Sequence, residues 1–99
     1  SIEIQTIMSL LKIIDNPIQD IPLVTVLRSY IGKFTDNDLI QIRLSDKNDN
    51  FYTCMEKAVV DVEDKLKNKI QTFFSNLNKW RKEKEYLSLY IVIQDFIIM

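Results

Sequence analysis

The chain has 99 residues, of which 46% are hydrophobic and 27% charged, with one glycine, one cysteine, no histidine and a net charge of −1. This length fits one domain, the apolar fraction is too high for an intrinsically disordered chain, and no apolar run approaches the ~18–20 residues that span a bilayer. The single glycine excludes a glycine-rich nucleotide loop, the lack of histidine excludes Ser-His-Asp and Cys-His catalysis, and the single cysteine excludes internal disulfides and cysteine-only zinc sites.

Two helices are predicted in the first third of the chain. Apolar residues recur at helical spacing over residues 2–14. Asn16 and Pro17 end this helix, because the residue before a proline is pushed out of the α region. The second helix is predicted from Asp20, as its N-cap, to about Tyr30.

A short loop and a third helix follow. We expect Gly32 to adopt a positive φ at the end of the second helix, since glycine reaches that conformation at no steric cost. Thr35 is the predicted N-cap of the third helix. The run from Thr35 to Asp38 resembles a capping box in which Asp replaces the usual Glu.

The second half of the chain predicts a turn and up to three further helices. Residues 44–50 are polar and predict a surface turn, after which Asn50 or Thr53 begins a helix. A regular apolar stripe predicts the longest helix over about residues 62–86. A last helix is predicted from near Ser88 to the chain end.

Together these elements predict an all-α fold. We expect five or six helices in a single compact orthogonal bundle, with a helix-hairpin-like loop near residues 28–38 and no linker that divides residues 1–99. The aromatic side chains of the long helix are expected mainly in the core rather than on a base-stacking surface: Phe73, Phe74, Trp80 and Tyr86.

Most residues that could carry chemistry favour a structural role. Asp36 and Asp38 suit capping better than acid–base catalysis, which needs a carboxyl with a shifted pKa in a cleft. Residues 46–50 resemble a calcium loop but lack its glycine and its final glutamate. Cys54 is predicted to be a core thiol with no basic partner nearby. An enzyme in its own right is therefore the least favoured function.

Positive charge is concentrated in one part of the chain. Residues 1–64 carry six Lys/Arg against eleven Asp/Glu, whereas residues 65–84 carry seven Lys/Arg against one Glu. Lysines that alternate with apolar residues along a helix usually mark a solvated face. A partner that carries negative charge is the alternative.

The loop between the second and third helices is a candidate phosphate site. Free backbone N–H groups of residues 32–34 and the start of the third helix could receive a phosphate, with Arg28 and Lys33 supplying charge. Asp36 and Asp38 oppose this, because they would repel the phosphate.

Several runs resemble one bacterial protein family. LLKIIDNPIQDIPL at residues 10–23, VLRS at residues 26–29, residues 32–39 and IRL at residues 42–44 resemble a segment of AddA. AddA is the UvrD-like superfamily 1 helicase and nuclease subunit of AddAB-type double-strand-break repair complexes. FYxxM at residues 51–55 and the run Lys79-Trp80-Arg81 also fit this resemblance, which covers residue 3 to about 86.

The resemblance implies a fragment of the helical accessory region called 2B, with no catalytic residue or metal of its own. ATP and Mg²⁺ would be bound elsewhere in the parent protein, in the bacterial cytoplasm and away from membranes. The implied partners are duplex DNA, the remaining helicase subdomains and the second subunit of the complex. The implied DNA contacts are Arg28, Ser29, Gly32 and Lys33, next to Tyr30 where the family usually has proline.

A helical protein-interaction module without DNA contact is the alternative function. Either the face of the long helix or the apolar C-terminal helix would then bind a partner protein. We expect the apolar residues 96–99 to be covered by the rest of the parent protein or by a second copy in a fragment dimer.

Overall fold

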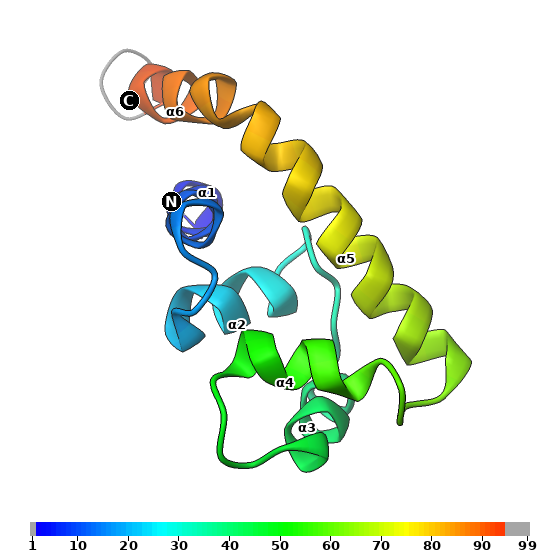
Figure 1. The fold of residues 1–99 in the computed structure, drawn as a ribbon. Coiled ribbons are helices and arrows are strands. Elements are labelled where there is room, and N and C mark those ends of the chain that lie inside the picture. Colours follow the sequence, from blue (N-terminus) through cyan, green and yellow to red (C-terminus); the bar gives the residue numbers. More distant parts are fainter. Residues whose placement is uncertain (1, 95–99) are drawn as a thin grey trace.

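The computed structural model of the chain describes residues 2–94, which form six helices and no strand (Figure 1). The all-α prediction is confirmed for this part of the chain. Among these residues, no helix combines the length and the apolar character needed to cross a membrane. The helices are α1 (Ile2–Asp15), α2 (Asp20–Arg28), α3 (Asp36–Ser45), α4 (Phe51–Ala58), α5 (Asp64–Lys82) and α6 (Lys84–Val92).

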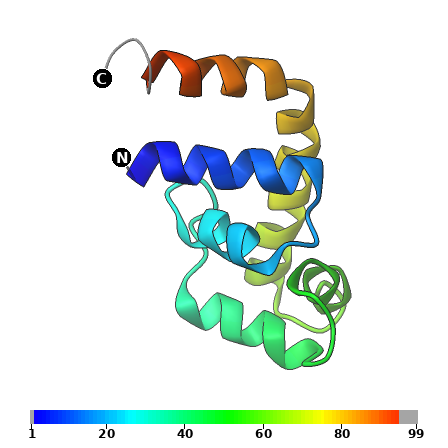
Figure 2. The ribbon, with the colours of Figure 1, turned by 90° about the vertical axis from the view of Figure 1, so that its left-hand side faces the viewer.

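The long helix α5 forms one side of the molecule in Figure 1. Helix α1 packs on α2, α3 packs on α4, and α6 lies beside α1. Figure 2 shows α1 and α6 running in opposite directions, so that the beginning of α1 and the end of α6 lie on the same side. The loop between α2 and α3 reaches the middle of α5, as Figure 1 shows.

The core is built by the first five helices. Each of these five helices contributes buried side chains, whereas no residue of α6 is buried. Tyr86 was expected in the core but is 77% exposed, because it lies on α6 and not on α5. The largest side chains with almost no exposure include Leu10, Ile13, Leu23, Leu27, Ile42, Met55, Ile70 and Leu77.

The boundary between the last two helices differs from the prediction. Helix α5 ends at Lys82 and α6 already begins at Lys84, so the prediction of one helix to residue 86 and another from Ser88 is wrong. Glu83 breaks the helix with φ −103° and ψ 11°. The regular apolar stripe ends at Trp80, and the chain turns shortly after it, which lets α6 pack beside α1.

Several predicted ends are confirmed, and one cap is not. Helix α1 ends before Pro17, and Asn50 caps α4 by accepting a hydrogen bond from the backbone N–H of Thr53 (2.9 Å). Asp20, however, is the first residue of α2 rather than its cap. Its carboxylate accepts a hydrogen bond from the backbone N–H of Phe51 (3.0 Å) and so links the start of α2 to the start of α4.

Candidate nucleic-acid interface

The α2–α3 loop is held by its own backbone. The N–H of Lys33 donates to the carbonyl oxygen of Ser29 (2.8 Å), and the N–H of Phe34 donates to that of Leu27 (2.8 Å). These two amides are therefore not available to a phosphate, which corrects the expectation of free N–H groups at residues 32–34. Phe34 is buried, and its ring meets that of Phe73 edge to face at 6.0 Å between centroids, which attaches the loop to α5.

Ser29 and Gly32 shape this loop. Helix α2 ends at Arg28, earlier than predicted. The hydroxyl of Ser29 donates to the carbonyl oxygen of Val26 (2.6 Å) and accepts from the N–H of Ile31 (3.1 Å). Gly32 has no positive φ; the left-handed residue is Lys33, with φ 59°. Glycine is needed at position 32 because a Cβ there would lie 2.5 Å from the carbonyl oxygen of Leu27.

The two carboxylates at the start of α3 are already engaged. Thr35 and Asp38 form the predicted capping box, in which each side chain accepts a hydrogen bond from the other residue's backbone N–H. Asp38 also accepts from the Lys69 ammonium (2.6 Å). Desolvation acts against the charged form of Asp38, but the hydrogen bonds from Lys69 and Thr35 outweigh it and lower the pKa of this carboxyl.

Arg28 is paired with the other carboxylate. Its Nε lies 3.1 Å from Oδ1 of Asp36, and both side chains are largely exposed. An exposed pair of this kind contributes little stability, so a phosphate can compete for the guanidinium. Lys33, by contrast, makes no ion pair within the described residues. Of the four candidates from the sequence, Lys33 therefore carries a charge that no carboxylate among residues 2–94 pairs.

The structure places the basic helix next to this loop. A groove of about 450 Å³, which we call the loop–α5 groove, separates residues 30–33 from the exposed face of α5. Lys33 lies on one wall, and Lys65 and Lys69 lie on the other. Lys65, like Lys33, makes no ion pair within residues 2–94. Both positive segments can be recognised along the chain, but their proximity is visible only in the fold.

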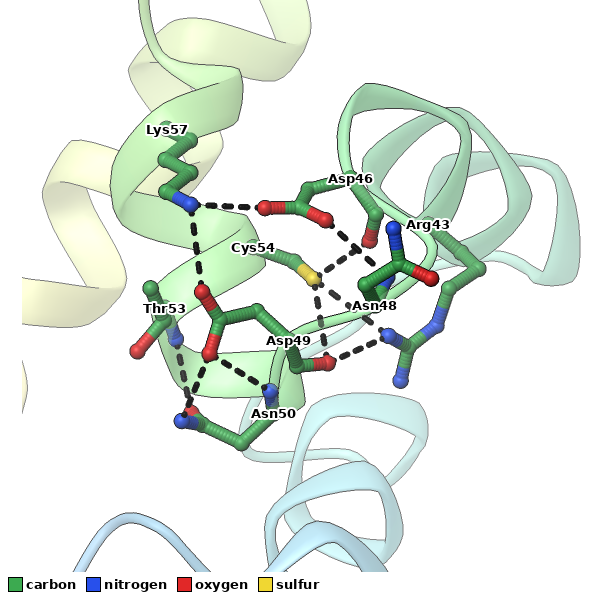
Figure 3. Close-up of polar contacts among 8 residues, drawn as sticks. All are labelled: Arg43, Asp46, Asn48, Asp49, Asn50, Thr53, Cys54 and Lys57. Atoms are coloured by element: carbon green, nitrogen blue, oxygen red, sulfur yellow. Dashed lines mark hydrogen bonds and ion pairs between the residues drawn. The ribbon is translucent and has the colours of Figure 1, made fainter.

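A second polar cluster, at the end of α3, is structural. Figure 3 shows the Lys57 ammonium between the carboxylates of Asp46 (2.6 Å) and Asp49 (3.1 Å), across the polar turn. Both carboxylates therefore already bind a cation from the chain itself. Within the described residues, no group of three or more His, Cys, Asp or Glu side chains is arranged to hold a metal ion.

Cys54 lies inside this cluster and is buried, as predicted. It does have a basic neighbour, contrary to the sequence prediction: Arg43 Nη1 lies 3.3 Å from Sγ and 2.7 Å from the carbonyl oxygen of Asp49 (Figure 3). Desolvation nevertheless dominates over the nearby guanidinium and raises the pKa of the thiol. A buried, protonated thiol is a poor nucleophile.

The described residues thus form a helical segment whose loop–α5 groove carries Lys33 and Lys65 without a carboxylate partner among residues 2–94. The chain is 46% identical to the AddA protein of the ATP-dependent helicase/nuclease of Clostridium botulinum (strain Loch Maree / Type A3), over 96% of this chain. It is 47% identical to the protein of the same name from Alkaliphilus metalliredigens (strain QYMF), over 90% of this chain. This chain is therefore homologous to one segment of the AddA proteins of ATP-dependent helicase/nucleases, which confirms the resemblance.

The chain is much shorter than these relatives. It spans 9% of the length of the Clostridium botulinum protein and 7% of that of the Alkaliphilus metalliredigens protein. No protein-family model matches the chain. The structure and the similarity together describe one helical part of a far larger kind of protein.

Proposed function

We propose that this chain is a non-catalytic accessory region of an ATP-dependent DNA helicase/nuclease and that it contacts the phosphates of duplex DNA. The helicase and nuclease activity proposed for the parent protein is inferred from the name of the relatives. The loop–α5 groove supplies the contact, because Lys33 and Lys65 lie on its two walls with no carboxylate partner among the described residues. Lysines that face phosphates position a protein on DNA without reading its sequence.

The rest of this proposal concerns the parent protein. ATP and Mg²⁺ would be bound by regions outside this chain, whose single glycine is too few for a phosphate-binding loop. The second subunit of the complex and the remaining helicase subdomains are the proposed protein partners. The bacterial cytoplasm is the proposed location, where chromosomal DNA is found.

We expect the double variant Lys33→Gln with Lys65→Gln to weaken binding of this chain to a fluorescently labelled duplex. Nonspecific binding of this kind has a Kd on the order of 10⁻⁴–10⁻⁶ M at physiological salt, so anisotropy is best measured at low salt. Each lost phosphate contact should reduce the slope of log K against log salt by about 0.9. The loss should be the same for unrelated duplex sequences.

Lys47→Gln is the matched control, since Lys47 is an exposed lysine in the polar turn between α3 and α4, outside the groove. It changes the net charge by half as much as the double variant, and adding Lys12→Gln in α1 equalises the change. If the control pair flattens the salt dependence as much as the groove pair does, binding follows net charge and the groove is not the contact.

A second candidate function is docking of α6 against other parts of the longer polypeptide. None of the residues of α6 is buried, and it exposes Leu89 (55%) and Val92 (45%). Exposed apolar side chains that lie close together commonly mark an interface. Since the chain spans less than a tenth of its relatives' length, the favoured occupant is polypeptide from the same protein. Residues 96–99, also expected at such an interface, lie outside the described residues.

The double variant Leu89→Ser with Val92→Ser should change the free energy of unfolding of this chain by no more than about 0.5 kcal/mol, because exposed side chains make few contacts. The same variant should bind the remaining helicase polypeptide more weakly in isothermal titration calorimetry. Sedimentation of the unaltered chain tests the alternative, in which a second copy of the chain covers α6. A concentration-dependent dimer that the double substitution abolishes would show that a second copy covers this helix instead.

A further inference from the structure

The size of the loop–α5 groove limits what can lie inside it. The groove holds about 450 Å³ between one short loop and one helix. A DNA duplex is wider than such a groove and can reach only the lysines at its rim. A single strand can lie within it, because its sugar–phosphate backbone and bases are not held in a rigid cylinder.

The groove also carries the side chains that single strands require. Tyr30 lines it at the loop end and is 55% exposed, so part of this residue is open to a ligand. Proteins that bind single strands combine a positively charged groove with aromatic rings on which bases stack. Lys33 and Lys65 provide the charge, and Tyr30 provides the ring.

Helix α5 adds a row of polar groups along the same groove. Asn68, Thr72 and Asn76 are four residues apart, so they lie on one face of α5, and all three line the groove. Amide and hydroxyl groups are frequent donors to phosphate and sugar oxygens. They are neutral and therefore add contacts without depending on salt.

We propose that the loop–α5 groove binds a short single-stranded stretch of DNA, with phosphates at Lys33 and Lys65 and one base stacked on Tyr30. This inference rests on the proposed function, because it refines which DNA structure the same groove takes. A duplex with a frayed or overhanging end would then contact the rim with its paired part and the groove with its unpaired strand.

The experiment measures anisotropy with three labelled probes: an oligothymidine of ten residues, a blunt duplex, and that duplex with a ten-residue thymidine overhang. We expect this chain to bind the overhang duplex more tightly than the blunt duplex. Tyr30→Ala should weaken binding of the oligothymidine and of the overhang duplex roughly 5- to 150-fold, the range that corresponds to losing one stacked base. Binding of the blunt duplex should change less than twofold. Tyr30→Phe, which keeps the ring, should restore most of the affinity.

Tyr86→Ala is the matched control, since Tyr86 is an exposed tyrosine on α6 outside the groove. An equal loss for blunt duplex and oligothymidine in Tyr30→Ala would overturn the inference, because it would show that Tyr30 acts on the shape of the loop. Binding of blunt duplex without any binding of oligothymidine would also overturn it while leaving the proposed function intact. If neither probe binds, both proposals fail.

Discussion

Replacing Phe34 by alanine is expected to lower the free energy of unfolding by about 3–5 kcal/mol. Phe34 is 4% exposed although it lies in a loop, and its ring packs edge to face on Phe73 of α5. The Lys69 ammonium lies 5.3 Å from the centre of the same ring. Removal of the ring leaves a cavity and deletes an aromatic pair and a cation–π contact together.

Urea unfolding followed by circular dichroism measures this effect. A stability of about 5–15 kcal/mol is usual for a small domain, so the loss should move the midpoint far toward zero denaturant. Phe34→Leu, which refills most of the cavity, should cost clearly less. Under conditions where Phe34→Ala still folds, it should also lose DNA binding, because the loop that carries Lys33 is then detached from α5. A variant as stable as the original chain would show that the loop is not anchored through this ring.

The features that were predicted correctly are local in the chain. The end of α1 before Pro17, the capping box from Thr35 to Asp38 and the cap at Asn50 each depend on a few adjacent residues. Backbone sterics and side-chain hydrogen bonds within four residues determine such features, so the residue types alone reveal them.

Two of the features that were missed depend on contacts between distant segments. Asp20 was expected to cap its own helix but accepts from the N–H of Phe51, which is 31 residues away. Cys54 was expected without a basic neighbour, yet Arg43 reaches it from α3. No periodicity along one helix reports which side chain another helix will bring near.

The candidate site was half predicted for the same reason. Lys33 was identified in the loop, and the basic character of residues 65–84 was recognised, but as two separate features. Phe34 and Phe73 bring them together, and only the folded chain shows that Lys65 faces Lys33 across one groove. The acidic residues expected to repel a phosphate are instead satisfied by Arg28 and Lys69. Their charge is thereby largely offset at the edge of the groove.

Gly32→Ala is expected to destabilise the chain by about 1–3 kcal/mol or more, the usual cost of forcing atoms into a closely packed place. A Cβ at position 32 would lie 2.5 Å from the oxygen, 2.6 Å from the Cα and 2.8 Å from the carbonyl carbon of Leu27. All three are backbone atoms of α2, so no side chain can rotate away to make room. The end of α2 or the loop must move, and the hydrogen bond from Phe34 to Leu27 weakens with it.

Glycine can be required because there is no space for a Cβ, as at position 32, or because φ is positive, as at position 33. A substitution at position 33 therefore tests the second reason separately. Lys33 carries φ 59°, a conformation that costs a residue with a side chain about 1–2 kcal/mol and costs glycine almost nothing. Lys33→Gly should therefore leave stability unchanged or raise it by up to about 1 kcal/mol in the same urea titration, although it removes a groove charge. If Gly32→Ala is tolerated, the close approach of the loop to α2 does not determine the choice of glycine at position 32. If Lys33→Gly destabilises the chain, relief of the positive φ does not determine the stability at position 33.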